Sequence, residues 1–353
     1  MDLLTHLKEL CEVAGLSAYE SSVRDVIRAA WEPLADEVRV DKFGSLWAIK
    51  TGVGRAPRHK AMLAAHMDAI GLMVTQVDGA FLRVTEVGGI DARVMPGQPV
   101  RVHASGASQS LPAIVGSRPP HLLSNAEREK ATPLEELFVD PGLPGEEVAR
   151  LVRVGDLISF GQPPFVMQGE LLVAKSLDNR ASIAAVTACL EALQHRRHEW
   201  DIVAVASAQE EENLGGARTT AFSVQPDLAV VLDVTWATGP GVPEHRAFPL
   251  GDGPTIALGP NIHPKLHRAL VAAAEKAEIA HHIEVIPLHS GTDAYAIQVT
   301  RSGIPAAVIG IPLRNMHTPV EIVSIKDIAR AGRLLAEFLE HLDDKFPDSL
   351  RLD

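Results

Sequence analysis

The chain has 353 residues, and its 45 acidic and 33 basic side chains give a formal net charge of −12. The hydrophobic share of 46% excludes wholesale disorder, and the acid surplus argues against nucleic acid or anionic membranes as partners. Two cysteines, Cys11 and Cys189, cannot form a disulfide scaffold and suit a reducing compartment, so we expect a cytoplasmic protein. We expect neither a secretion signal nor a membrane span, because no stretch has the required apolar run.

Two helices are expected at the start of the chain, because apolar residues recur there at helical spacing. The first covers residues 3–11 and stops near Gly15. The second begins at Ser21, a residue suited to capping, and ends at Pro33. The pattern then changes to strands. A strand pair turns near Gly44, and the unbroken apolar run at residues 61–65 is typical of a strand buried on both faces.

Residues 71–164 have a different texture. Short Val-rich runs are broken there by Gly, Pro and Ser, and only residues 133–138 and 145–151 have a helical pattern. Many short strands without crossover helices indicate a small β-barrel or sandwich. We therefore expect a β-rich domain at 71–164, inserted between the two parts of a catalytic domain, residues 1–70 and 165–353.

Strands and helices alternate from residue 169 onward. The expected helices cover residues 179–194, 215 onward, 263–277, 294–299 and 325–342. The expected strands cover residues 202–207, 228–234, 282–286 and 306–310. This alternation predicts the α/β class, with a mainly parallel sheet sandwiched by helices.

Side chains of the metal-binding type follow five of the expected strands. They are His66 with Asp68, Asp178, Glu210 with Glu211 and Glu212, Asp233, and His317. Sites in open α/β sheets form outside the carboxyl ends of the strands, so these side chains should meet at one edge. Each residue alone could be a helix cap or a loop residue, and Glu212, the third consecutive acid, is interpreted as a solvated charge.

Several carboxylates would then share one partly dry cleft. Such crowding of like charge is costly unless the acids take up protons or bind cations. Protonation of several acids at neutral pH is implausible, whereas two divalent cations would offset the charge and activate water between them. Mixed imidazole and carboxylate ligands suit zinc, cobalt or manganese better than calcium. We expect two divalent ions per subunit, with Zn²⁺ or Co²⁺ ahead of Mn²⁺.

Six segments carry a family resemblance: AAHMDAIGLMV, KSLDNRAS, QEEENLGGA, VLDVTWATG, GTDAYA and GIPLRNMHTPVE. In this order they resemble the tetrahedral (TET) aminopeptidases, a family of dinuclear metallopeptidases also labelled glutamyl aminopeptidase or, misleadingly, cellulase M. The resemblance covers essentially the whole chain and implies a zinc-peptidase-like (phosphorylase/hydrolase-like) fold, with the inserted β-barrel as a dimerisation domain. It implies an aminopeptidase acting on peptides, whose dimers assemble into a tetrahedral dodecamer.

The resemblance also implies a ligand set, carried over by motif position. His66 and Asp233 would ligate one metal ion, and Glu211 and His317 would ligate the other. Asp178 would bridge the two ions, and the peptide bond after it would be cis. The implied reaction is attack of a metal-bound hydroxide on the scissile carbonyl.

Three more residues receive roles from the resemblance. Glu210 would be the general base that takes the proton of the attacking water and passes it to the leaving amine. Asp68 would orient His66, a task that needs only a carboxylate two residues on. His289 lies in a stretch that lines the family's substrate cleft, and it would contact substrate or be a simple loop histidine.

Two positions depart from the family's usual pattern. Ala69 replaces a Glu after the His-x-Asp pair, and residues 212–217, including Gly215, differ from the usual sequence after the paired acids. Both changes are expected near the substrate, so the preferred N-terminal residue stays open. Two alternatives to a peptidase also stay open: a homologue that binds metal with little activity, and a glycoside hydrolase, although glycosidases rarely need His ligands.

Overall fold

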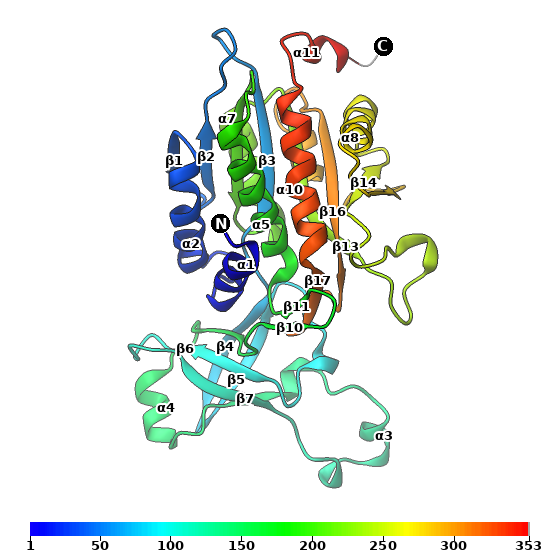
Figure 1. The fold of residues 1–353 in the computed structure, drawn as a ribbon. Helices are drawn as coiled ribbons and strands as arrows, with labels where there is room; N and C mark the ends of the chain where they lie inside the picture. Colours follow the sequence, from blue (N-terminus) through cyan, green and yellow to red (C-terminus); the bar gives the residue numbers. More distant parts are fainter. Residues whose placement is uncertain (352–353) are drawn as a thin grey trace.

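The computed structural model describes residues 1–351, and its larger part is built on an eleven-stranded sheet (Figure 1). Nine strands follow one another across the sheet: β1 (Glu37–Val40), β2 (Leu46–Lys50), β12 (Asp201–Ser207), β3 (Lys60–His66), β13 (Leu228–Trp236), β16 (Ala306–Arg314), β17 (Glu321–Ser324), β11 (Leu171–Ala174) and β10 (Phe165–Met167). The remaining two are β14 (Thr255–Leu258), which pairs with β16, and β15 (His282–Val285), which pairs with β14.

Four strands at the centre of the sheet, β12, β3, β13 and β16, run parallel. Successive residues along them are buried, so both faces of the sheet are covered. The strands on either side pair antiparallel. The predicted α/β class with a largely parallel core sheet is therefore confirmed.

The helices that cover the sheet form two groups. In one group, α5 (Leu177–Ala192) packs against α1 (Leu3–Glu12), α2 (Ser21–Trp31) and α10 (Ile325–Glu340), which Figure 1 shows in front of the strands. In the other, α7 (Gly215–Val224) packs against α9 (Asp293–Gln298). The helix α8 (Pro264–Lys276) packs against α10 of the first group and against β14. The helices predicted in this part of the chain are present. The short strands β10, β14 and β17 were not predicted. No helix within residues 1–351 could cross a membrane.

A closed six-stranded β-barrel is inserted after β3 and lies below the sheet in Figure 1. Around the barrel the strands are β4 (Gly71–Asp78), β5 (Phe81–Val87), β8 (Phe138–Asp140), β7 (Leu111–Gly116), β6 (Pro99–His103) and β9 (Leu157–Phe160). The barrel has its own hydrophobic core and carries the short helices α3 (Asn125–Arg128) and α4 (Gly145–Leu151). Of the two helical patterns predicted here, 145–151 is confirmed, whereas 133–138 forms only a 3-10 turn before β8.

Lys175 is a buried cation between the barrel and the sheet. It follows β11, is only 6% exposed and lines a cavity shared with Arg101 and His103 of barrel strand β6. Its ammonium donates to the carbonyl oxygen of Val13, just past the end of α1, at 3.1 Å. Burial, assisted by the charge of Arg180, lowers the pKa of Lys175 from 10.5 to about 7.

This lowered pKa predicts a pH-dependent stability. Below about pH 7 the ammonium of Lys175 is charged in both the folded and the unfolded chain. Burying this charge lowers the free energy of unfolding by on the order of 5 kcal/mol, relative to burial of the neutral amine. Between about pH 7 and 10.5 the unfolded chain binds more protons, so this cost falls and stability rises with pH. We expect Lys175→Met to raise the melting temperature most near pH 6.5, with a gain that shrinks steadily towards pH 9.5.

The measurement is thermal melting of wild type and variant across that pH range. Lys42→Met is the matched control, because it makes the same replacement at an exposed position. A Lys175→Met effect that is constant with pH would contradict the prediction.

Candidate active site

The residues predicted from the strand ends converge at the carboxyl edge of the parallel strands. His66 is the last residue of β3, and Asp233 lies near the end of its neighbour β13. Asp178 stands at the start of α5, and Glu211 lies in the helical turn that follows β12. His317 comes from the turn between β16 and β17. Segments far apart in the chain thus deliver all five proposed ligands to one place.

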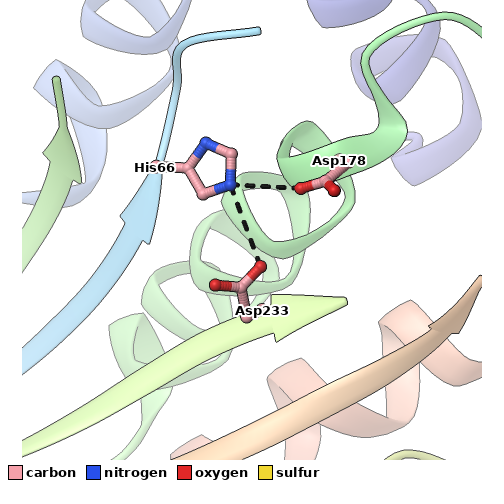
Figure 2. A group of neighbouring side chains, drawn as sticks. All are labelled: His66, Asp178 and Asp233. Atoms are coloured by element: carbon pink, nitrogen blue, oxygen red, sulfur yellow. Dashed lines mark hydrogen bonds and ion pairs between the residues drawn. The ribbon is translucent and has the colours of Figure 1, made fainter. Parts of the chain in front are cut away.

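The first group consists of His66, Asp178 and Asp233, all buried (Figure 2). The Nε2 atom of His66 lies 3.1 Å from Oδ1 of Asp178 and 3.8 Å from Oδ1 of Asp233. Figure 2 shows the imidazole directed at both carboxylates, one on β13 and one at the start of α5. One ion placed among these three side chains could bind all of them.

The second group consists of Asp178, Glu211 and His317. The Nε2 atom of His317 lies 3.5 Å from Oδ2 of Asp178 and 3.5 Å from Oε2 of Glu211. Asp178 therefore belongs to both groups and turns a different oxygen to each histidine. The peptide bond that follows Asp178 is cis, as the family resemblance implies.

Crowding drives the pKa values of the four acids apart. Burial, reinforced by neighbouring negative charge, raises the pKa of Glu210 and of Asp233 well above the ordinary range and raises that of Glu211 to about 7. Burial would raise the pKa of Asp178 too, but hydrogen bonds from the two histidines lower it instead. The two histidines therefore lower the pKa of Asp178, whereas burial raises the pKa of the three other acids.

The histidines respond in the opposite sense. Burial alone would lower the pKa of His66, but the charge of Glu210 and the hydrogen bond to Asp178 raise it well above the usual value. The hydrogen bond to Asp178 is the main reason why the pKa of His317 rises to about 9. Protons on the histidines and on the acids offset the negative charge of the carboxylates in this arrangement. Divalent cations would take the place of these protons. Two imidazoles and three carboxylates, with the ligand atoms of each group within 4.8 Å, fit two such ions.

Asp68 lies behind His66 and is fully buried. Its carboxylate accepts hydrogen bonds from the backbone N–H groups of Glu210 at 3.0 Å and Glu211 at 3.2 Å, and from the hydroxyl of Ser17. Nδ1 of His66 lies 3.5 Å from the Asp68 carboxylate and 3.2 Å from its carbonyl oxygen. An Nδ1–H directed at Asp68 leaves the Nε2 lone pair facing the other acids. The position of Asp68 therefore suits the orienting role expected of it.

The helical turn α6 (Glu210–Asn213) presents three consecutive acids in different directions. Oε2 of Glu210 lies 3.8 Å from Nε2 of His66, and the side chain faces the cavity at the site. Glu212 is exposed, and its Oε1 accepts from the backbone N–H of Gly88 at 2.9 Å, so it also contacts the chain leaving barrel strand β5.

A cavity of about 660 Å³ opens in front of the two groups. His289 lies on its wall, exposed, with its ring centroid 5.3 Å from that of Tyr295. Ala69 does not line this cavity, contrary to the expectation that it lies near the substrate. It is buried and forms a bridge with Leu16.

Glu321 is a site residue that the strand-end pattern missed. It is 2% exposed, and its two oxygens accept from the backbone N–H groups of Asp178 at 3.0 Å and His317 at 2.9 Å. Burial and the charge of Asp178 raise the pKa of Glu321 well above the ordinary range. Its only signal in the sequence is its place at the end of the segment GIPLRNMHTPVE, four residues after His317.

Asp293, in the segment GTDAYA, was also missed. It is 1% exposed and accepts from the hydroxyl of Ser207 at the end of β12. Burial raises the pKa of Asp293 to about 6.

The inserted barrel also contributes a contact to the site, because the carbonyl oxygen of Gly89 lies 2.9 Å from Nδ1 of His317. This contact leaves Nε2 of His317 directed at the acids.

The sheet, the inserted barrel and the two His–carboxylate groups together define a metal-dependent hydrolase of the α/β class. A family model described as M42 glutamyl aminopeptidase matches residues 44–334. The chain belongs to this family of metallo-aminopeptidases, which confirms the resemblance to the TET and glutamyl aminopeptidases.

Known proteins resemble the chain over nearly its whole length. The Lysyl aminopeptidase of Pyrococcus furiosus is 36% identical over 95% of this chain and 96% of its own. The TET aminopeptidase from a marine sediment Thaumarchaeota archaeon superposes with a TM-score of 0.93 at 32% identity, covering 99% of both chains.

Two more solved structures bear on assembly and naming. The Pyrococcus horikoshii TET1 peptidase, which can assemble into a tetrahedron or a large octahedral shell, has a TM-score of 0.84 at 28% identity, covering 97% of this chain and 100% of that one. A Thermotoga maritima protein named Endoglucanase has a TM-score of 0.78 at 27% identity, covering 98% and 99%.

The contacts of Glu321 predict a role in metal affinity. In Glu321→Gln one carboxylate oxygen becomes an NH₂ group that faces a backbone N–H, so Asp178 or His317 should shift. We expect Zn²⁺ to bind about 10- to 100-fold more weakly, measured by competition with a chromophoric chelator. Glu9→Gln, at an exposed position of α1, is the control and should bind as wild type does. Unchanged affinity in Glu321→Gln would exclude this role.

Proposed function

We propose that this chain is a dinuclear metal-dependent aminopeptidase that removes N-terminal residues from peptides. The observation that carries the proposal is the double use of Asp178, whose Oδ1 faces His66 and whose Oδ2 faces His317. A carboxylate with this placement suits a bridge between two ions, and ions held about 3.5–4 Å apart are suited to hydrolysis. Membership of the M42 family supports the choice of peptide substrates.

The proposed ligands follow the two groups. His66 and Asp233 would hold one ion, Glu211 and His317 the other, and Asp178 both. Zn²⁺ and Co²⁺ are the first candidates, followed by Mn²⁺. When bound, the ions would polarise the scissile carbonyl and lower the pKa of the attacking water.

Glu210 is the proposed general base. It faces the cavity beside both groups and belongs to neither, so its carboxylate is available to hold a proton. It would accept the proton of the attacking water and return it to the leaving amine. Asp68 would act through His66 by fixing its orientation, and through Glu210 by holding its backbone N–H. His289, on the cavity wall, is proposed to contact the substrate.

The proposed domain organisation is a catalytic domain of residues 1–70 and 165–353 with an inserted barrel domain at 71–164. The separate hydrophobic cores of sheet and barrel support this division. We propose that the barrel mediates dimerisation and that dimers assemble into a tetrahedral dodecamer. The Pyrococcus horikoshii TET1 peptidase, which can assemble into a tetrahedron, supports this proposal.

Two alternatives are separated from the proposal by one experiment. A metal-binding homologue with little activity is one of them, and a glycoside hydrolase, raised by the name of the Thermotoga maritima relative, is the other. We expect the Co²⁺- or Zn²⁺-loaded protein to release p-nitroaniline from aminoacyl anilides, and a chelator to abolish this release. Metal content without turnover would favour the first alternative, and activity on β-glucans alone would favour the second.

Replacement of Glu210 tests its role as base. Glu210→Gln keeps the size of the side chain but cannot accept the proton, so kcat should fall by about 10²- to 10⁴-fold while both ions stay bound. Turnover and elemental analysis on the same preparation measure the two effects. Glu212→Gln is the control from the same helical turn, because its amide oxygen can still accept from Gly88. Turnover near the wild-type rate in Glu210→Gln would refute the assignment.

A further inference from the structure

One carboxylate of the active-site cavity takes no part in the proposed chemistry. Five carboxylates line this cavity, and four of them are the proposed ligands Asp178, Glu211 and Asp233 and the proposed base Glu210. The fifth is Glu284, which lies on β15 near the edge of the sheet. It belongs to neither metal group.

Glu284 is held in place by hydroxyl groups. Its Oε1 accepts from the hydroxyl of Thr235 on β13 at 2.6 Å, and its Oε2 accepts from the hydroxyl of Thr255 on β14 at 2.7 Å. Gly310 on β16 leaves room for this cluster, because a Cβ atom there would lie 2.4 Å from Oγ1 of Thr255 and 3.1 Å from Oε2 of Glu284. Three strands thus fix the carboxylate in one position.

The charge of Glu284 has no cationic partner in the part of the chain that the structure describes. No Lys, Arg or His nitrogen of residues 1–351 lies within 4.0 Å of its carboxylate. Two hydroxyl donors use only part of the acceptor capacity of a carboxylate, which has about four lone-pair sites. A fixed negative charge with free acceptor capacity, on the wall of a cavity, is suited to binding a cation.

Glu284 is linked to the proposed metal groups through strand β13, because Thr235 on that strand donates to its carboxylate. Asp233 and Thr235 are two residues apart on β13, so their side chains point to the same face and their Cα atoms lie about 7 Å apart. A substrate whose first peptide bond lies at Asp233 would therefore send its N-terminal side chain along β13 towards Thr235 and Glu284. The four-carbon stem of lysine suits this reach.

We propose that Glu284 makes this aminopeptidase selective for peptides with a cationic N-terminal residue, Lys or Arg. The proposal rests on the proposed function and names its substrate class. The competing feature is Arg246, which lines the same cavity and would attract an acidic side chain. Arg246 is exposed at the end of a short 3-10 turn (Glu244–Arg246), whereas Glu284 is fixed on a strand by two hydrogen bonds.

The test is a panel of Lys, Arg, Leu and Glu p-nitroanilides with the metal-loaded wild type and Glu284→Gln. In the wild type we expect kcat/KM to be highest for Lys and Arg. In Glu284→Gln the values for Lys and Arg should fall by about 10- to 100-fold, while the value for Leu changes less than about threefold. Glu275→Gln, an equal charge change at an exposed position of α8, should leave the whole panel unchanged.

The outcomes separate this inference from the proposed function. If no anilide is cleaved, the proposed function fails. If the wild type prefers Leu or Glu, or if Glu284→Gln keeps its Lys and Arg activity, only the selectivity proposal is overturned. Leu turnover reports folding of the variant. If Leu turnover is also lost in Glu284→Gln, a second variant, Thr235→Val, provides the test. It keeps the Glu284 carboxylate but removes one hydroxyl that donates to it. The ratio of kcat/KM for Lys to that for Leu must then fall, and an unchanged ratio overturns the proposal.

Discussion

The burial of several carboxylates around Asp178 is the constraint on which the site depends. Carboxylates placed this close in a dry environment repel one another, and burial adds a desolvation cost to each charge. Here His66 and His317 take opposite oxygens of Asp178, while the neighbouring acids are driven towards their protonated forms. Such an arrangement is unfavourable for a merely structural role, because apolar residues of similar volume would stabilise the fold better. It is favourable for a site that exchanges protons for divalent cations.

Two buried acids hold the backbone around this cluster without belonging to it. Asp68 accepts from two consecutive N–H groups of α6, and Glu321 accepts from the N–H groups of Asp178 and His317. These contacts fix turns that come from distant parts of the chain, so the side chains need little reorganisation to bind an ion. The carbonyl oxygen of Gly89 extends the same support to His317 from the barrel. An assembly that holds the barrel would therefore also steady a proposed ligand.

The sequence predicted the features that have a periodic or local signal. The apolar runs that end at His66 and Asp233 identified the central strands, and the carboxyl-edge rule placed the acids together. A strand as short as β17 has too few residues for an alternating apolar pattern to be recognised. Neither β17 nor its first residue, Glu321, was therefore predicted. Its hydrogen bond to Asp178 joins residues 143 positions apart, which no local pattern encodes. The assignment of Asp178 as the bridge came from the family resemblance, because spacing alone does not distinguish one acid from another.

The same strand that supplies a proposed ligand also leads to the proposed selectivity residue. On β13 the pleat turns Asp233 and Thr235 to one face, and Thr235 binds the carboxylate of Glu284. Glu284 itself lies on β15, a strand that pairs with β14, so a substitution there need not move a ligand, and it would act on the N-terminal side chain of the substrate. With this separation, a substitution at position 284 would change the preferred N-terminal residue without disturbing the proposed metal ligands. The preferred N-terminal residue would then depend on the charge at position 284, and hydrolysis would depend on the cluster around Asp178.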